Sequence, residues 1–256
     1  MVRAEIAQGT AGRVARVVLD RPEKKNAITA EMYVQLAEAL AAADADARVR
    51  AILLSGSKDC FTAGNDVADF LQRPPSGGGS PTWRFFEVLP NLAKPIVAAV
   101  GGPAIGIGTT LLLHCDLVYA ASQARFQLPF VPLGIVPEFA STYLLPLLAG
   151  YQRAAELLLL GQPFDAEKAR EVGMVTAVFP QEILFSEAEK TARVLASLPP
   201  ESLRLTKQLL KKRHRQAIGE AIAEETKIFS ERLSSPEAKE AMSAFMEKRK
   251  PDFSRF

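Results

Sequence analysis

The sequence predicts an α/β fold with a helical C-terminal segment, and three observations favour it. Two short apolar runs, at residues 51–54 and 95–100, are apolar on both faces, as strands are when helices cover both sides of a sheet. Helical patterns alternate with such strands. From residue 182 onward the pattern is helical almost throughout, so we expect a core over residues 1–198 and a helical subdomain over 199–256.

Composition limits the classes of protein that remain. A chain of 256 residues with 48% hydrophobic and 23% charged residues is long enough for a sizeable core and has a globular composition. The net charge of +2 gives no global field that would attract nucleic acid or an anionic membrane. No long apolar segment opens the chain, and glycines interrupt the apolar stretch 95–113, so a cytoplasmic protein is expected.

The elements follow in chain order from local signals. Residues 14–19 form a strand that ends at the turn Asp20-Arg21-Pro22, and Thr29 caps a helix that runs to about residue 43. The strands 51–54 and 95–100 come next. Between them, residues 73–80 are rich in Gly, Pro and Ser, which predicts a surface loop that either covers a site or is inert. The C-terminal helices are expected at 182–197, 201–213, 216–233 and 236–248.

Two turns after strands could offer backbone N–H groups to a ligand. Residues 101–110 contain several glycines and open a helix. The third glycine of a dinucleotide fingerprint would fall at Leu111, and no Gly-Lys-Ser/Thr follows, so neither phosphate motif fits. Two interpretations of Gly108 remain. Its missing side chain leaves the backbone at a helix N-terminus accessible to a ligand, or it allows close contact between the helix and a strand. Ala63, in the turn 60–66, could offer a second N–H group, although a simple turn is the alternative.

Glu138 is the candidate acid–base residue. Pro137 suits a first helical position, so we expect Glu138 in the first turn, either as a solvated partner of the helix dipole or as a base. An apolar pocket would raise the proton affinity of its carboxylate; the residues that could form it are Phe130, Leu133, Val136 and Phe139.

Other chemistries have little support. A nucleophile elbow is missing, and His114 and His214 lie in apolar and basic helical patterns that suggest structural or solvated roles. His and carboxylate residues show no metal-ligand spacing, and Cys60 and Cys115 fit neither a disulfide framework nor a zinc site. No metal is therefore expected.

The order and spacing of several motifs resemble the crotonase superfamily, the enoyl-CoA hydratase/isomerase group. These motifs are Asp20-Arg21-Pro22 with Asn26-Ala27, Phe61-Thr62-Ala63-Gly64-Asn65-Asp66, residues 94–100, Gly106-Ile107-Gly108 with Cys115-Asp116, and residues 126–129, 169–178 and 245–251. The resemblance implies a crotonase (ClpP-like) spiral of strand-strand-helix units and a homotrimer or dimer of trimers formed through the C-terminal helices. It also implies acyl-CoA thioester substrates, with coenzyme A as part of the substrate and no separate cofactor.

The resemblance also implies roles for individual residues, which we assign from their positions in the shared motifs. The resemblance implies an oxyanion hole formed by the N–H groups of Ala63 and Gly108, with Glu138 as the catalytic base. It further implies substrate contacts from Lys24, Lys25, Ala27, Ala63, Gly64, Asn65, Asp66, Phe130, Phe245 and Lys248. Solvent-facing lysines are the alternative for the basic positions.

Two departures from the family pattern favour one reaction. Hydratases of the family carry two glutamates where this chain has Thr110 and Phe130, and hydration divides its proton transfers between those carboxylates. Moving a double bond from the 3,4 to the 2,3 position needs one base, so the resemblance favours a Δ3-Δ2-enoyl-CoA isomerase.

Three alternatives stay open. One is a hydratase or another crotonase reaction, and another is a crotonase fold without activity. The third is an RNA-binding relative, because Lys207, Lys211 and Arg215 share one helical face. The small net charge makes nucleic-acid binding a minor alternative.

Overall fold

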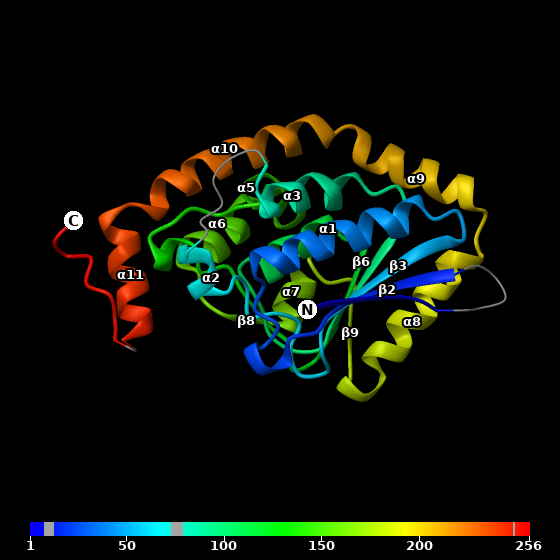
Figure 1. Ribbon diagram of the computed structural model, residues 1–256, viewed down its shortest axis with the longest axis horizontal. Coiled ribbons are helices and arrows are strands. Elements are labelled where there is room, and N and C mark those ends of the chain that lie inside the picture. The colour runs from blue at the N-terminus through cyan, green and yellow to red at the C-terminus, as the bar shows by residue number, and fades with distance from the viewer. Residues whose placement is uncertain (8–12, 73–78, 248) are drawn as a thin grey trace.

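The computed structural model describes residues 1–7, 13–72, 79–247 and 249–256, and its centre is a six-stranded sheet (Figure 1). The strand order is β1-β2-β3-β4-β6-β9; β1 is antiparallel to β2 and the other neighbours are parallel. A smaller sheet has the order β5-β7-β8. The strands are β1 (Val2–Ala7), β2 (Arg13–Leu19), β3 (Val49–Ser55), β4 (Ile96–Val100), β5 (Ala104–Ile105), β6 (Leu117–Ala121), β7 (Arg125–Gln127), β8 (Phe164–Asp165) and β9 (Ala177–Phe179).

Helices surround the large sheet. The α-helices are α1 (Ala30–Ala45), α2 (Val67–Gln72), α3 (Pro81–Asn91), α4 (Ile107–Thr110), α5 (Ser141–Ala149), α6 (Tyr151–Leu160), α7 (Ala166–Glu171), α8 (Gln181–Ser197), α9 (Pro200–Lys212), α10 (Arg215–Leu233) and α11 (Pro236–Met246). Short 3-10 helices are η1 (Pro22–Lys24), η2 (Leu111–His114) and η3 (Val131–Leu133).

The alternation of side chains along the strands divides the core into two layers. Ala51 and Leu53 of β3 belong to a cluster with the small residues Ala188 and Ala192 of α8. The residue between them, Ile52, points the other way and joins the larger cluster with α1, α3 and α4, because successive side chains of a strand face opposite sides. Both faces of the sheet are therefore buried, as the apolar runs predicted.

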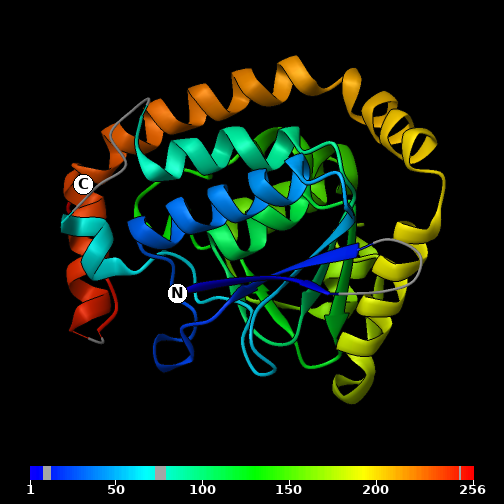
Figure 2. The same ribbon diagram turned by 45° about the vertical axis from the view of Figure 1, so that its right-hand side comes forward.

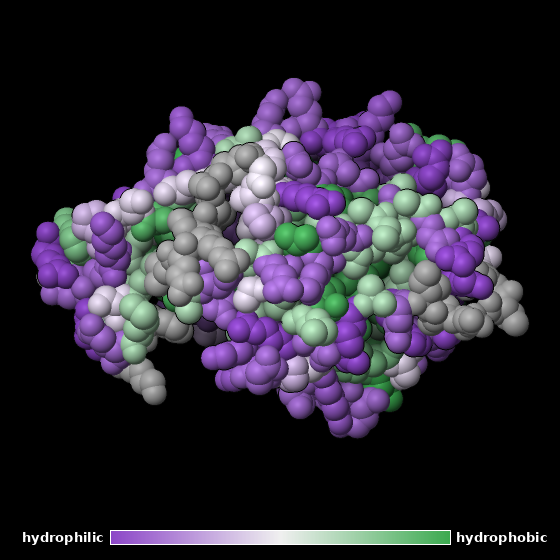
Figure 3. All heavy atoms as spheres, in the orientation of Figure 1, coloured by the Kyte–Doolittle hydropathy of each residue, from purple (hydrophilic) through white to green (hydrophobic). Residues whose placement is uncertain are grey.

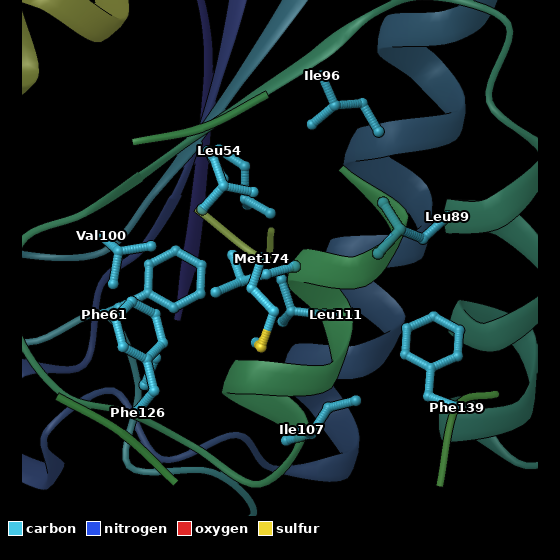
Figure 4. Packing of buried hydrophobic residues seen from close by; sticks show 14 of the residues in the cluster. Leu54, Phe61, Leu89, Ile96, Val100, Ile107, Leu111, Phe126, Phe139 and Met174 are labelled. Atoms are coloured by element: carbon cyan, nitrogen blue, oxygen red, sulfur yellow. The ribbon is translucent and has the colours of Figure 1, made fainter. Parts of the chain in front are cut away.

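The larger layer is rich in aromatic side chains. Leu111 lies in its middle, with Phe61 and Phe126 on one side and Phe139 on the other (Figure 4). All four side chains have an exposed fraction of 1% or less. This packing fixes α4 and η2 against the sheet and so fixes the start of α4.

A strand of the large sheet is repeatedly followed by a strand of the small sheet and then by a helix. β4 leads into β5 and α4, and β6 leads into β7, η3 and α5. This repeat is the strand-strand-helix unit expected from the sequence. It places α4 and the chain before α5 next to each other, since Thr110, the last residue of α4, contacts Glu138.

The local sequence signals located many elements correctly. Thr29 accepts a hydrogen bond from the Met32 amide (3.3 Å) at the start of α1, and the four C-terminal helices lie close to their expected positions. The sequence interpretation missed β1 and α3. Of the expected loop 73–80, residues 73–78 lie outside the described residues.

The C-terminal helices divide between the two sides of the molecule. α8 packs on one face of the sheet, whereas α9 and α10 arch over the helices on the other face (Figures 1 and 2). Hydrophilic side chains dominate the outer edge formed by this arch (Figure 3). Among the described helices, none has the length and apolar character needed to cross a membrane.

Of the basic face expected from the sequence, two residues of α9 are turned toward the protein, whereas Arg215, the first residue of α10, is exposed. Lys207 is 6% exposed and its Nζ lies 2.7 Å from Asp116 Oδ2, while Lys211 donates to the His114 carbonyl at 3.0 Å. The two lysines point into the protein because they join α9 to the chain around η2 and β6. This orientation reduces the basic surface on which the RNA-binding alternative depended, since two of its three residues are held by contacts within the protein.

Candidate active site

Glu138 is buried in an irregular segment before α5. The expectation that it lies in the first turn of a helix is wrong, because α5 begins at Ser141. Its carboxyl is 5% exposed, and Thr110 donates a hydrogen bond to Oε1 at 2.5 Å. Burial raises the pKa of Glu138 to about 8, the Thr110 hydrogen bond lowers it, and the negative charge of Glu225 raises it further. Glu138 can therefore accept and return a proton near neutral pH.

The two residues after Glu138 form an unusual bend. Phe139 and Ala140 have φ values of 60° and 57°, in the left-handed region that costs non-glycine residues about 1–3 kcal/mol each. Packing holds the first of them: the Phe139 ring stacks on Phe86 with centroids 4.0 Å apart. His114 Nε2 lies 2.9 Å from the Phe139 carbonyl oxygen. The bend turns the chain sharply between the Glu138 side chain and α5.

Glu138 lines a small pocket between α3 and α10. Beside Glu138 the pocket is lined by Asn65, Ser80, Thr82, Trp83, Phe86, Thr226 and Phe229. The apolar surroundings thus come from α3 and α10, and not from the expected convergence of Phe130, Leu133 and Val136. About 20 Å³ is open to the centre of a water-sized molecule, enough for one water. An acyl chain therefore needs side-chain movement in α3 or α10.

The expected role of Ala63 as an N–H donor conflicts with the structure. Its amide donates to the Lys25 carbonyl at 2.9 Å, so this N–H group is already used within the chain. The Gly64 amide is also engaged, by Thr62 Oγ1 at 3.1 Å. Gly64 has φ +89°, and a Cβ there would lie 2.8 Å from the Ile105 carbonyl oxygen, so glycine is required at this turn.

The next amide in the same turn is available. Among the described residues, nothing accepts a hydrogen bond from the Asn65 N–H group, and Asn65 lines the pocket with Glu138. The side chain of Asn65 is held in place, because Tyr33 donates to its Oδ1 at 2.6 Å. Asn65, expected only as a substrate contact, therefore replaces Ala63 as the candidate donor.

The start of α4 supplies the second set of donors. Within the described chain the N–H groups of Ile107 and Gly108, its first two residues, have no acceptor. Gly106 precedes them with φ 56° and ψ −119°, a conformation open almost only to glycine. The missing Cβ of Gly108 faces Thr62, so close packing of α4 against the turn 60–66 explains that glycine. The Ile107 amide, which the sequence interpretation missed, is as available as that of Gly108.

The segment expected to hold coenzyme A lies beside this turn. Lys24 and Lys25 are exposed, and within the described residues neither forms an ion pair. Ala27 accepts a hydrogen bond from Arg21 at 3.0 Å through its carbonyl. Arg21 also donates to Asp66 at 2.7 Å, and Asp66 caps the start of α2 through the Ala68 and Asp69 amides. Asp66 thus has a structural function, whereas the two lysines are free to meet phosphates.

The remaining expected contacts are less informative. Phe130 is buried, with 4% exposure, at the start of η3. Phe245 lies in α11, and Lys248 lies outside the described residues. The described residues contain no cluster of His, Cys, Asp and Glu that could hold a metal.

The histidines and cysteines have structural environments. Burial lowers the pKa of His114 to about 3, so its ring is neutral at physiological pH. His214 Nδ1 lies 2.9 Å from the Tyr143 hydroxyl. Cys60 and Cys115 are both free thiols. Burial raises the pKa of each thiol, which disfavours thiolate chemistry.

Three functional candidates come from α10, far from the other site residues in sequence. Glu225 contacts the bend after Glu138, and Thr226 and Phe229 line the pocket. The Thr226 hydroxyl is buried and has no hydrogen-bond partner among the described residues. An amphipathic helical pattern predicts α10 but does not say which part of the core it covers, so the sequence interpretation missed these three residues.

Comparisons with known proteins agree with this architecture. The enoyl-CoA hydratase/isomerase family matches residues 9–255. A crystal structure of an enoyl-CoA hydratase/isomerase from Pseudoalteromonas atlantica T6c superposes with a TM-score of 0.92 at 41% identity, covering 98% of this chain and 99% of that one. The chain belongs to the enoyl-CoA hydratase/isomerase (crotonase) family and has its α/β fold.

Curated relatives include more than one kind of isomerase. Human enoyl-CoA delta isomerase 2 is 35% identical over 243 residues, which cover 92% of this chain but only 61% of the relative. The chain therefore spans about three fifths of the length of that protein. The 1,2-epoxyphenylacetyl-CoA isomerase of Escherichia coli strain K12 is 37% identical over 247 residues, covering 94% of each chain.

Proposed function

We propose that this protein is an acyl-CoA isomerase that moves the double bond of a 3-enoyl-CoA to the 2,3 position. The observation that carries the proposal is the environment of Glu138. It is a buried carboxyl with a pKa raised to about 8, and it shares a pocket with an unpaired backbone amide. One carboxyl in such a place suits a reaction in which a single proton leaves one carbon and returns to another.

The reaction would begin with the thioester oxygen bound by backbone N–H groups. The Asn65 amide and the first amides of α4, at Ile107 and Gly108, would donate to it. As Glu138 removes a proton from C2, the electron pair moves into the carbonyl and forms a dienolate, whose negative oxygen these donors stabilise. Glu138 then returns the proton at C4, and the remaining double bond lies between C2 and C3. Atoms and charge balance without a cofactor.

The exposed lysines support a coenzyme A ester as substrate. Lys24 and Lys25 lie beside the turn that carries Asn65, since the Lys25 carbonyl accepts from the Ala63 amide in that turn. Ammonium groups in this position would attract the phosphates of coenzyme A and leave the thioester near Glu138. A homotrimer or dimer of trimers and a cytoplasmic location stay predictions.

Hydration is the less favoured reaction because it requires two groups to handle the water and its proton. Among the described residues that line the pocket, Glu138 supplies the one carboxyl. Thr110, where the resemblance to the family implies a glutamate in hydratases, hydrogen-bonds to Glu138. Its hydroxyl would thus orient the base and could not deliver a proton as an acid does.

The test is a substrate panel with the purified protein. A 3-enoyl-CoA should gain the absorbance of a conjugated 2-enoyl-CoA, and Glu138→Gln should lower kcat by about 10²–10⁴-fold. Glu182→Gln, at an exposed glutamate of α8, serves as the control. Equal rates for Glu138→Gln and the parent protein would disprove the assignment.

Two further substrates separate the alternatives. Loss of conjugated absorbance from a 2-enoyl-CoA would identify a hydratase. Turnover of 1,2-epoxyphenylacetyl-CoA in preference to the 3-enoyl-CoA would favour the reaction named for the E. coli relative.

A further inference from the structure

The bend after Glu138 depends on a residue from another part of the chain. Ala140 is the residue before α5, and it has no side chain able to cap that helix. Glu225 of α10 supplies the missing acceptor: its Oε2 accepts from the Ala140 amide at 2.5 Å, and its Oε1 accepts from the Thr142 amide at 2.9 Å. The Thr142 hydroxyl also donates to Oε1 at 2.5 Å. One carboxylate therefore joins the second residue of the left-handed bend to the first turn of α5.

The surroundings of the Glu225 carboxylate disfavour its charged form. Glu225 is 5% exposed, and burial raises its pKa to about 7 while its three hydrogen bonds lower it. The titratable groups around the bend are Glu138 before it, His114 from η2, whose ring is neutral at physiological pH, and Glu224 on the same helix. None of these is a cation at neutral pH. Hydrogen bonds to the bend are therefore what retains the charge.

The left-handed bend at Phe139 and Ala140 directly follows the proposed base, Glu138, in the chain. A change in the backbone at Phe139 or Ala140 rotates the peptide that follows Glu138, and the Glu138 carboxyl would leave its hydrogen bond with Thr110. A shift of about 1 Å at a catalytic group can lower a rate on the order of 10²-fold. We infer that Glu225 is a positioning residue, which fixes Glu138 against Thr110 by holding the Phe139–Ala140 bend in its left-handed conformation. This inference rests on the proposed function only in taking Glu138 as the base.

The first experiment compares two variants of neighbouring glutamates. Glu225→Gln keeps the size of the side chain but cannot accept all three hydrogen bonds. Glu224→Gln removes the same charge from an exposed position one residue earlier and is the matched control. We expect Glu225→Gln to lower kcat for 3-enoyl-CoA about 10- to 100-fold with KM changed less than about threefold, and the control to behave as the parent. Parent-like kcat in Glu225→Gln would overturn the inference.

The second experiment tests whether Glu225→Gln lowers kcat by destabilising the left-handed bend. Glycine adopts a positive φ without strain, so Ala140→Gly should let the bend form without Glu225. We expect Ala140→Gly combined with Glu225→Gln to recover a large part of the lost kcat. If the double variant is as slow as Glu225→Gln, then Glu225 does not act by holding the bend, and the inference fails.

A third measurement is independent of turnover. The carboxyl carbon of Glu138 can be followed by NMR as a function of pH without substrate, using Glu138→Gln to assign the signal. Glu225→Gln should lower the pKa of Glu138, because burial is the largest cause of its raised pKa and the charge of Glu225 adds to it, and losing both outweighs losing the Thr110 hydrogen bond. An unchanged pKa would count against the inference. An inactive parent protein would refute the proposed function and leave this measurement valid.

If Glu225→Gln does not fold, Thr142→Val provides the test. Thr142 is exposed, and this variant removes only the hydroxyl donor to Glu225. A kcat lowered about three- to tenfold with unchanged thermal stability would support the inference, whereas full activity would contradict it.

Discussion

At the scale of single residues, burial controls the protonation of Glu138. The pKa of about 8 means that the carboxyl is mostly protonated at pH 7, whereas a base must be ionised before it removes a proton. We therefore predict that kcat/KM for a 3-enoyl-CoA rises about tenfold per pH unit below pH 8 and levels off above it. A pH–rate profile of the parent protein measures this directly. A rate that is constant between pH 6 and 9 would show that burial does not set the pKa of the base.

The same burial makes stability depend on pH. The pKa of Glu138 is higher in the folded protein than the ordinary value of 4.5, so folding favours the protonated form. Its contribution is complete below about pH 4.5 and is lost as pH rises through 8. Glu138→Gln should thus be more stable than the parent at pH 9, on the order of 5 kcal/mol, with little difference at pH 4.5. Urea unfolding at both pH values tests this, and equal differences at both would contradict it.

Thr226 has a polar group that the protein itself does not satisfy. Thr226 lines the pocket and its hydroxyl is buried without a partner in the described chain, so we expect a bound substrate or water to provide the hydrogen bond. Thr226→Val should leave thermal stability unchanged or raised, and should increase KM about three- to tenfold. Lower stability with unchanged KM would show that the hydroxyl serves the fold.

At the scale of elements, the start of α4 depends on the conformation of one glycine. A Cβ on Gly106 would meet nothing within 4 Å, so the cost of Gly106→Ala comes only from its φ of +56°, about 1–3 kcal/mol. Relaxation would turn the Ile107 amide and lower kcat about 10- to 100-fold. Gly219→Ala in α10, where a Cβ also meets nothing, should instead stabilise a helix by about 0.5–1 kcal/mol. Thermal unfolding and turnover of both variants test this contrast.

Elements with strong local signals were predictable, and contacts between distant elements were not. The apolar runs of β3 and β4 and the Thr29 cap of α1 follow from their own residues. The Glu138 segment looked helical because Pro137 suits a helix start, yet Glu225 and the Phe139 ring impose a left-handed bend there. The position of Ala63 in its motif suggested that its amide is an oxyanion donor, but that amide already donates to the Lys25 carbonyl. Hydrogen bonds between segments decided both outcomes, and no single segment contains that information.

At the scale of the whole molecule, the C-terminal helices complete the site and do not stand apart from the core. α10 supplies Glu225, Thr226 and Phe229, and the buried Lys207 of α9 forms an ion pair with the partly buried Asp116 between η2 and β6. Asp116 in turn accepts from the Ile96 amide of β4 at 2.8 Å. A boundary at residue 198 therefore separates chain segments that share buried contacts.

Unfolding should therefore be a single cooperative event over residues 1–198 and 199–256. Trp83, the one tryptophan of the sequence, lines the pocket with Thr226 and Phe229 of α10, so its fluorescence reports on the contact between the two parts. Far-ultraviolet circular dichroism reports on all helices together. We predict that urea produces coincident transitions in both signals, because loss of α10 would expose the buried carboxyls and the pocket lining of the core. A loss of helical signal before the fluorescence changes would show that the C-terminal helices are an independent domain.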